Sequence, residues 1–442
     1  MWRAALTGLC SCAALASAAL WPAGAGATVT TCDNVGGSLT VAFDATTSQL
    51  SLIRSGSSIQ VFDGAPSGSP VTCLGAAATV NNVDSISVSD LPPSHSSTVL
   101  VSLQGGPFAP GLTPEPAGSE IEIAVNGGGS SADLLAVDGT DSADVLRFGQ
   151  LGAGAIRGNL NPDQESGGPD YDDVSTTGVE QLLANGRPGG DELNASGDPA
   201  RGLGAADPDR LTLQGGNDRD TLRGGPGADI LQGGVFDDTL LGGAGDDSLD
   251  GGEGDDKLDG GTGADSVEGG NGVDRAVYDT RGTPVTASVG NGARDDGGAE
   301  DQSGPARDNL GPTVESVTGG AANDLLIGSP LGNNLVGGLG ADLMLGMAGN
   351  DDLDGGAGRD AINGGLGVDH ILGGGRNDKL IGGGGRDFMR GGRGRDLFKG
   401  QGGNDRLTAR DGARDRKIDC GKGRNRRERA VIDESDPQPR SC

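Results

Sequence analysis

An aspartate recurs at every ninth residue through most of the second half of the chain, always inside the same pattern. The pattern is Gly-Gly-x-Gly-x-Asp-x-U-x, in which U is apolar, and Gly242–Asp250 and Gly251–Asp259 are two clear copies without a gap between them. Seven units occupy residues 215–277 and ten occupy residues 319–408. A fixed period of this kind predicts a repeat architecture in which every unit contributes the same side chains.

The sixth position of each unit is the candidate metal ligand. Sixteen of the seventeen sixth positions are aspartate, namely Asp220, Asp229, Asp238, Asp247, Asp256, Asp265, Asp274, Asp324, Asp342, Asp351, Asp360, Asp369, Asp378, Asp387, Asp396 and Asp405. The exception is Asn333. All seventeen eighth positions are apolar, from Leu222 in the first unit to Leu407 in the last. Each unit is therefore expected to supply one carboxylate and one buried apolar side chain.

The two halves of a unit have different physical roles. Glycine tolerates a positive φ and leaves carbonyl oxygens uncovered, and aspartate favours turns, so the first six residues are expected to form a turn. The last three residues are expected to form a short strand with one side chain facing inward. Carboxylate and carbonyl oxygens in a flexible frame suit Ca²⁺, whereas zinc prefers nitrogen and sulfur ligands. A disordered glycine-rich segment is the alternative, and the strict register argues against it.

These units resemble the RTX (haemolysin-type) calcium-binding nonapeptide repeats of exported bacterial proteins. The resemblance covers residues 215–277 and 319–408. It implies an all-β fold, a parallel β-roll (β-solenoid), here preceded by an irregular β-rich N-terminal region. It also implies that two units make one turn of the roll and that Ca²⁺ lies between turns on the same side. The sixth-position aspartates and the turn carbonyls would be its ligands.

The number and strength of the calcium sites follow from this arrangement. If a site needs two units one turn apart, the two blocks provide about thirteen sites at most. Extracellular sites with a Kd of roughly 10⁻⁴–10⁻³ M would together add on the order of 18 kcal/mol at tenfold excess, more than the net stability of a typical domain. Calcium is therefore expected to decide whether the arrays fold. The strongest sites are expected around 238–265 and 342–369, and weak ones near Asn333 and in the last, arginine-rich units.

Composition and the N-terminus indicate an exported, acidic chain. The 442 residues include 87 glycines and only 2% aromatic residues, and the net charge is −30; a large globular core is excluded. Arg3, the apolar run that follows and Ala25-Gly26-Ala27 predict a signal peptide cleaved after Ala27, and hence a secreted, extracellular protein. A membrane anchor and a lipoprotein at Cys12 are the alternatives. No other apolar run could span a bilayer, and the charge argues against nucleic acid.

The chain divides into seven predicted segments. These are the signal peptide at 1–27, a β-rich N-terminal domain at 28–130, degenerate solenoid repeats at 131–214, the first repeat block at 215–277, an insertion loop at 278–318, the second block at 319–408 and a basic C-terminal cap at 409–442. Four cysteines remain after removal of the leader, and their proximity favours the pairs Cys32–Cys73 and Cys420–Cys442, although other pairings stay open.

The partners expected from the residues are calcium ions and, less directly, a polymer. Residues 386–429 carry an excess of basic side chains over acidic ones in a chain that is otherwise acidic. These charges either offset the nearby aspartates or bind an anionic cell-envelope or extracellular polymer.

The residues do not predict an enzyme. The sequence contains no nucleophile elbow, zinc-protease motif or P-loop. His95 is expected in a loop, and His370, at a seventh position, is expected to face solvent. The most direct interpretation is an extracellular calcium-binding protein with a structural or adhesive role. The alternative is a secreted polysaccharide-active or other hydrolytic enzyme whose catalytic part lies in residues 28–214.

Overall fold

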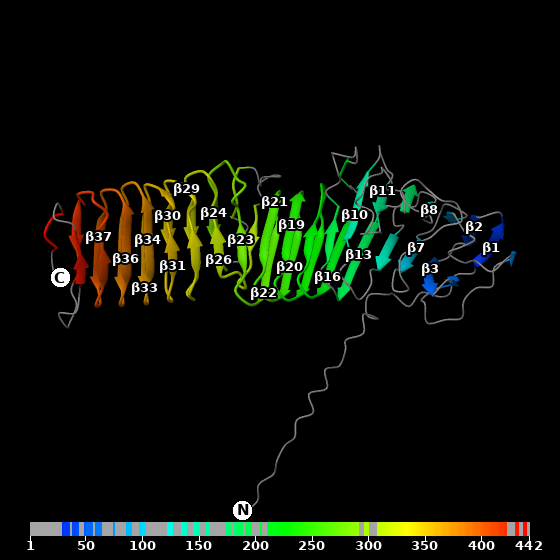
Figure 1. The fold of residues 1–442 in the computed structure, drawn as a ribbon, viewed down its shortest axis with the longest axis horizontal. Coiled ribbons are helices and arrows are strands. Elements are labelled where there is room, and N and C mark those ends of the chain that lie inside the picture. The colour runs from blue at the N-terminus through cyan, green and yellow to red at the C-terminus, as the bar shows by residue number, and fades with distance from the viewer. Residues whose placement is uncertain are drawn as a thin grey trace, which may run out of the picture.

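Parallel strands stacked into a long rod form the described part of the chain (Figure 1). The structure is a computed structural model, and it describes strands β1–β15 and residues 191–195, followed by residues 210–290, 296–299, 307–421, 429–432 and 436–439. Every element in these ranges is a strand, which confirms the all-β solenoid. No helix among the described residues has the length and apolar composition needed to cross a bilayer.

The strands fall into four groups along the chain. The N-terminal group is β1 Val29–Val35, β2 Ser38–Phe43, β3 Ser48–Ser55, β4 Ser58–Asp63, β5 Leu74–Gly75, β6 Ser85–Asp90, β7 Ser97–Ser102, β8 Glu122–Asn126, β9 Leu134–Asp138, β10 Val145–Gln150, β11 Ile156–Asn159, β12 Val174–Thr177, β13 Gln181–Pro188, β14 Glu192–Asn194 and β15 Gly204–Ala205. The first block holds β16 Arg210–Asn217, β17 Thr221–Arg223, β18 Ile230–Val235, β19 Thr239–Ala244, β20 Ser248–Glu253, β21 Lys257–Thr262, β22 Ser266–Asn271 and β23 Arg275–Val277.

The other two groups are the junction between the blocks and the second block. The junction holds β24 Thr286–Ser288, β25 Asn309–Leu310 and β26 Ser316–Thr318. The second block and the C-terminal end hold β27 Leu325–Ile327, β28 Asn334–Val336, β29 Leu339–Gly340, β30 Leu343–Leu345, β31 Asp352–Asp354, β32 Ala357–Gly358, β33 Ala361–Leu366, β34 His370–Gly375, β35 Lys379–Gly384, β36 Phe388–Arg393, β37 Leu397–Gly402, β38 Arg406–Thr408, β39 Lys417–Asp419 and β40 Arg429–Val431.

Successive units alternate between two faces of the rod. On one face β17, β19, β21, β23, β26, β28, β31, β34, β36, β38 and β40 pair in parallel, and we call this face the long sheet. On the other face β16, β18, β20 and β22 pair in the same way. Paired residues such as Thr239 and Lys257 belong to alternate units. One turn of the solenoid therefore contains two nonapeptide units.

Many strands are longer than the three residues expected from the pattern. β20 continues from its apolar position through Gly251 and Gly252, and Gly252 pairs with Gly234 and Gly270 in the neighbouring strands. Gly252 has a φ of 110°, and a Cβ there would collide with the carbonyl oxygen of Gly234. Because glycine has no Cβ, the backbone of one turn can pack directly on the next, and sheet pairing extends into the turn.

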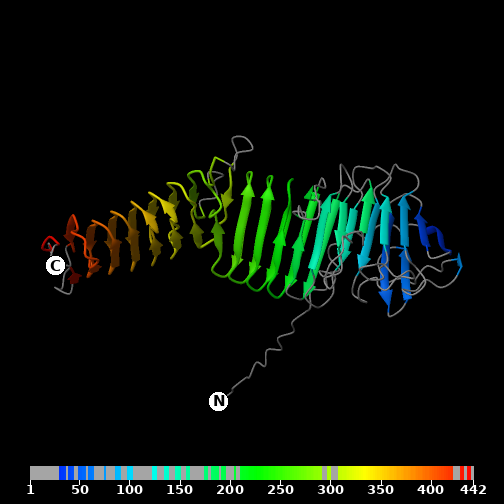
Figure 2. The same cartoon turned by 45° about the horizontal axis from the view of Figure 1, so that its top comes forward.

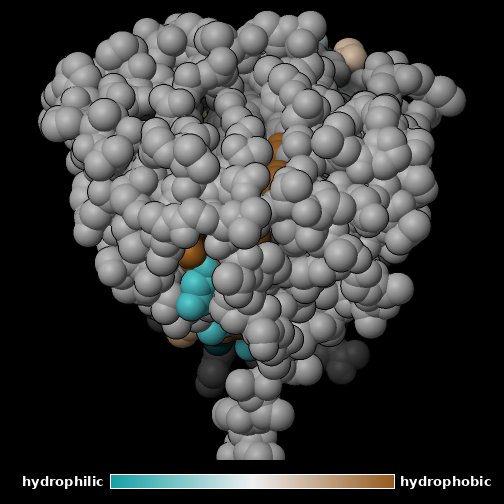
Figure 3. Space-filling model, turned by 90° about the vertical axis from the view of Figure 1, so that its right-hand side faces the viewer, coloured by the Kyte–Doolittle hydropathy of each residue, from teal (hydrophilic) through white to brown (hydrophobic). Residues whose placement is uncertain are grey.

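A single core runs along the rod between the two faces. All seventeen eighth positions are buried, and they belong to one cluster of buried residues that extends from Val41 to Cys420. Figure 3 views the rod from its N-terminal side, and the hydrophobic residues visible there lie inside the outline of the molecule. The predicted inward orientation of the eighth position is thus confirmed, with about one large apolar side chain in each layer.

Strands ahead of the repeats join the same faces. β3, β7, β9, β13 and β16 pair in parallel in that order, and β10, β14 and β17 do so in the long sheet. At the N-terminal end, β1–β2 and β3–β4 are antiparallel pairs. Strand pairing therefore crosses residues 130 and 214, where the sequence predicts domain boundaries, and those boundaries stay predictions.

The two blocks meet in a junction that is asymmetric. On the long sheet a single strand, β26, lies between β23 and β28. On the other face β22 pairs with β25, Asp296 and Gly297 form antiparallel bridges to Asp308 and Thr286, and β24 then pairs with β27. Between β22 and β27, this face therefore has three paired layers, namely β25, the bridged residues 296–297 and β24. Regular alternation of units would place one layer there, so the face is longer by about 10 Å. Figure 2 shows the rod changing direction at this place.

Candidate metal centres

The sixth-position aspartates lie inside the turns and are buried. Their exposed fractions do not exceed 3%, although burial of an ionised carboxylate is unfavourable unless a partner compensates it. Each turn stacks on the turn two units away, so the aspartates form two rows, one along each edge of the rod. The first row contains the turns 224–229, 242–247 and 260–265, and the second contains 233–238, 251–256 and 269–274, with corresponding turns in the second block.

One oxygen of each aspartate takes part in a ladder along its row. The backbone N–H of Asp238 donates to Oδ1 of Asp256 at 2.7 Å, and that of Asp256 donates to Oδ1 of Asp274 at 2.9 Å. The same contact links Asp342 to Asp360 and Asp360 to Asp378, at 2.9 Å in both cases. These bonds join residues 18 positions apart, so the carboxylate aligns turn on turn.

The second oxygen is the chemically informative one. Among the described residues, Oδ2 is buried without a hydrogen-bond partner in Asp220, Asp238, Asp247, Asp256, Asp274, Asp342, Asp351, Asp360, Asp369, Asp378, Asp387 and Asp415. An ionised oxygen in such surroundings is costly, and pairing with a cation or protonation removes the cost. A Cβ at the first glycine of the unit would also collide with this oxygen, as at Gly251 beside Asp256.

The pKa values of the row aspartates are raised by the same unfavourable burial of charge. Burial, followed by repulsion from Asp265, Asp229 and Asp246, raises the pKa of Asp247 to about 8. Burial likewise raises the pKa of Asp238 to about 7, with smaller contributions from neighbouring aspartates. Like-charge repulsion between neighbouring aspartates is therefore present within the rows, and a cation between turns would relieve it.

The ladder includes acids that lie outside the seventeen regular units. The N–H of Asp396 donates to Oδ1 of Asp415 at 2.7 Å, and burial raises the pKa of Asp415 to about 7. At the other end the N–H of Asp191 donates to Oδ1 of Asp220 at 2.7 Å. Asp191 keeps the sixth position of a degenerate unit at 186–194, which is a usable sequence signal. Asp415 lies 19 residues after Asp396. The regular spacing along a row is 18 residues, so the nine-residue period does not predict Asp415.

Three sixth positions differ from the others. Oδ2 of Asp229 and of Asp324 accepts a backbone N–H four residues earlier, at 2.8 and 2.7 Å. In Asn333 the amide oxygen accepts the N–H of Ser329 at 2.7 Å, and Nδ2 donates to the carbonyl of Glu315 at 3.1 Å. The protein itself thus supplies hydrogen-bond partners for the polar side-chain atoms of these residues, and the weak site expected at Asn333 stays a prediction.

A family model decides which repeat this is. The RTX calcium-binding nonapeptide repeat family, described as four copies, matches residues 212–240, 241–276, 327–362, 336–371, 363–398 and 381–413. The repeats of this chain are RTX calcium-binding nonapeptide repeats. No curated protein sequence matches it. The matches lie on the two repeat blocks, whose glycine-aspartate turns are described above. The RTX repeats are calcium-binding repeats.

The RTX turns fit a calcium ion by their donor chemistry. Among the described residues, no group of three or more His, Cys, Asp or Glu side chains is arranged so that it could hold a metal ion by itself. Ca²⁺ also accepts backbone carbonyls, and the glycines leave these uncovered. The residues that would hold it are the aspartates with a buried, unpaired Oδ2 together with carbonyls of the same and the adjacent turn. Each ion would neutralise carboxylates of two stacked turns.

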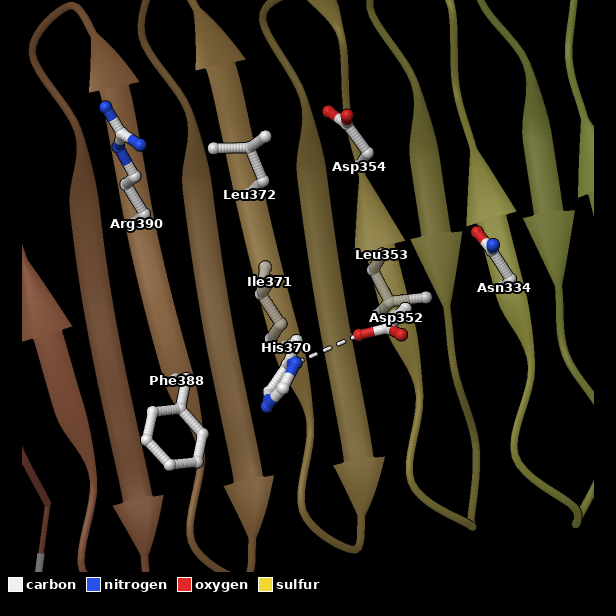
Figure 4. Close-up of a pocket in the computed structure, with 9 residues that line it drawn as sticks. All are labelled: Asn334, Asp352, Leu353, Asp354, His370, Ile371, Leu372, Phe388 and Arg390. Carbon is white, nitrogen blue, oxygen red and sulfur yellow. Dashed lines mark ion pairs between the residues drawn. The ribbon is translucent and has the colours of Figure 1, made fainter.

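The remaining residues singled out from the sequence lie elsewhere. His370 faces solvent on the long sheet, as predicted, and its Nδ1 lies 3.1 Å from Oδ1 of the exposed Asp352. Together with Phe388 and Arg390 these residues line a shallow groove of 350 Å³ (Figure 4). His95, Cys73, Cys442 and the predicted signal peptide lie outside the described residues. Cys420 is buried at the end of the core, and both cysteine pairings stay predictions.

Proposed function

We propose that this RTX protein is exported, that its repeat blocks fold as they bind several Ca²⁺ ions, up to about thirteen, and that it acts outside the cell as a structural or adhesive protein rather than as an enzyme. The observation that carries the proposal is the pair of buried aspartate rows in which many members, such as Asp238, Asp247 and Asp360, have a second carboxylate oxygen without a hydrogen-bond partner. At neutral pH only a bound cation lets all of these groups ionise inside the stack.

The thin core supports the coupling of folding to calcium. Each unit buries one principal apolar side chain, as Leu249 and Leu258 do in adjacent layers. Burial of one leucine contributes about 1.5–3 kcal/mol, whereas ordering nine residues costs on the order of 10 kcal/mol. Backbone pairing recovers part of the difference, and aspartate repulsion opposes it. Metal binding by the folded state alone would supply the remainder.

The export and adhesion parts of the proposal rest on sequence and charge. The predicted signal peptide at 1–27 would deliver the chain to surroundings in which calcium is abundant. Near the C-terminal end of the rod, Arg386, Arg390, Arg393 and Arg395 are exposed. This basic end would attract an anionic polymer, while the acidic remainder of the rod would repel it.

Calcium-driven folding can be tested on the full mature chain. Far-ultraviolet circular dichroism would be recorded in chelator and then through a titration with millimolar Ca²⁺, with Mg²⁺ as the control cation. We expect the β signal and a cooperative thermal transition to develop with Ca²⁺ and not with equal Mg²⁺, because Mg²⁺ retains its water ligands. A β signal that chelator does not change would contradict the proposal.

The non-enzymatic part has a separate test. The calcium-loaded chain would be incubated with a panel of neutral and anionic polysaccharides, and both binding and the release of reducing ends would be measured. We expect salt-sensitive binding of anionic polymers without turnover. Release of reducing ends that a single carboxyl-to-amide substitution abolishes would establish a polysaccharide-active enzyme instead.

A further inference from the structure

The first row of turns continues through the junction, but its fourth turn has a different sequence. Regular pairing aligns β21 with β23 and β23 with β26, so residues 278–281 stand between the turns 260–265 and 319–324. The N–H of Tyr278 donates to the carbonyl of Thr318 at 2.8 Å, and the N–H of Ala321 donates to the carbonyl of Arg281 at 3.1 Å. Tyr-Asp-Thr-Arg therefore replaces Gly-Gly-x-Gly at this level.

The side chain of Arg281 points back into the row. It is only 4% exposed. Its Nη2 donates to the carbonyl oxygen of Gly261 and lies 3.3 Å from Oδ1 of Asp259, and its Nη1 donates to Oγ1 of Thr280 at 2.9 Å. The guanidinium carbon lies 5.5 Å from the centre of the Tyr278 ring. A positive charge is thus held between two consecutive turns by a carboxylate, a turn carbonyl and an aromatic ring.

The carbonyl of Gly261 belongs to the set that faces from turn to turn along this row. In the regular turns the corresponding carbonyls of Gly225 and Gly243 point at the second glycine of the following turn. At the junction, Asp279 occupies the position of the second glycine. The guanidinium of Arg281 donates to the carbonyl of Gly261 instead. Burial raises the pKa of Asp259, and the charge of Arg281 opposes this rise. The arginine therefore acts on the oxygens of the row as a cation.

We propose that Arg281 is a built-in cation that takes the place of calcium between the turn 260–265 and the junction turn, so that the two blocks stay stacked without a metal ion at this level. A guanidinium suits this place because it offers several N–H donors in one plane and keeps its charge when buried. Unlike Ca²⁺, it cannot dissociate when calcium is scarce.

Further hydrogen bonds between protein groups cross the junction. The carboxylate of Asp296, which is fully buried, accepts the N–H of Ser288 at 2.5 Å and that of Leu310 at 3.0 Å, and so ties β24 to β25. The hydroxyl of Tyr278 donates to Oδ2 of Asp308 at 3.1 Å. In the second row, Oε2 of Glu315 accepts the N–H of Asp274 at 3.0 Å. The junction thus has the hydrogen bonds to stay ordered while the regular turns depend on cations.

This inference rests on the proposed calcium binding of the neighbouring turns, and amide hydrogen exchange of the full chain separates the two. Exchange would be followed in chelator and in millimolar Ca²⁺ for peptides covering 259–290 and 309–325, and for regular turns such as 242–257. In wild type we expect the junction peptides to keep protection in chelator while the regular turns lose it. If the regular turns also keep protection, the proposed function fails, and the effect of Arg281 can still be measured.

Three variants decide the role of the charge. Arg281→Gln is expected to speed exchange of the junction peptides in chelator by at least about tenfold, because a buried charged hydrogen bond is lost. Arg281→Lys restores a cation and is expected to recover most of the protection. Arg275→Gln, on the exposed face of β23, is the matched control and is expected to leave exchange unchanged. Exchange in Arg281→Gln equal to wild type would overturn the proposal. Should Arg281→Gln fail to fold even in calcium, a lysine variant that fails equally would also overturn it.

Discussion

The regular RTX turns and the junction at 278–318 both stack one layer of the rod on the next, but they do so with different side chains and contacts. A regular turn stacks glycine backbone on glycine backbone and buries one carboxylate per unit, such as Asp247 or Asp351. The junction replaces glycine with Tyr278 and Arg281 and ties its strands with hydrogen-bonded side chains such as Asp296. The regular turn can be repeated along the chain, but each repeat adds another buried carboxylate to the row. The junction arrangement occurs at one place among the residues that the structure describes, because its contacts depend on particular residues.

The comparison shows how a roll can tolerate an interruption. The long sheet passes the junction with one strand, β26, while the opposite face gains extra layers. An inserted segment is therefore accepted when it preserves pairing on one face and closes the other with its own hydrogen bonds. The resulting wedge explains the change of direction in Figure 2.

The largest expected difference between the two regions concerns glycine. Gly245 has a φ of 135°, and a Cβ there would collide with the backbone of Gly227, whereas a Cβ at Gly282 in the junction would meet no atom within 4 Å. We expect Gly245→Ala to lower the free energy of unfolding by about 2–4 kcal/mol and Gly282→Ala to change it by less than about 0.5 kcal/mol. Denaturant unfolding in calcium measures both. Equal effects would break the distinction between the two kinds of turn.

The pH dependence of the metal-free protein is the next largest effect. Burial raises the pKa of Asp247 to about 8 and those of Asp351 and Asp378 to about 7 from an ordinary value of 3.8. The folded state therefore binds more protons than the unfolded state, so its stability is greatest near pH 4 and falls as pH rises through 7–8. Each such carboxyl contributes to the loss, by at most about 1.4 kcal/mol for every unit by which its pKa is raised.

Denaturant midpoints in chelator from pH 4 to pH 8 check this dependence. In calcium the trend should reverse over the upper part of the range, because the ion binds the deprotonated carboxylates. Protection of junction amides should change less with pH than that of the regular turns. Stability in chelator that rises steadily with pH would contradict the account of the aspartate rows.

The smallest expected effect is the difference in stability between substitutions at Asp351, a regular sixth position, and at Asn333, a sixth position beside the junction. In chelator Asp351→Asn should leave stability unchanged or raise it, since it keeps the acceptor for the N–H of Asn333 and removes a buried charge. Asn333→Asp should lower it by about 1 kcal/mol, since the bond from Nδ2 to the Glu315 carbonyl is lost. Thermal unfolding in chelator measures both, and calcium stoichiometry should fall only for Asp351→Asn. Equal changes in stability and in calcium stoichiometry for the two variants would show that the two positions are equivalent.

Much of the regular structure can be predicted from the repeat itself. The aspartate period locates the turns, and the apolar eighth positions, such as Leu258 and Phe398, are buried as expected. The β-rich region expected at 28–130 contains strands such as β2, β3 and β7. The extension of the strands into the glycines could not be read from the pattern, because it depends on the approach of a neighbouring turn.

Sequence alone determined the period, the oxygen chemistry of the turns and the single apolar side chain per unit, because each of these is local and repeats. Only the tertiary structure decided that the carboxylates are buried with one oxygen hydrogen-bonded to the next turn, that Asp415 continues their row, and that Arg281 and Asp296 hold the junction. The contacts of Asp415, Arg281 and Asp296 join segments that do not follow the nine-residue period. Their partners are set by how an inserted loop folds back on the stack, which no local pattern encodes.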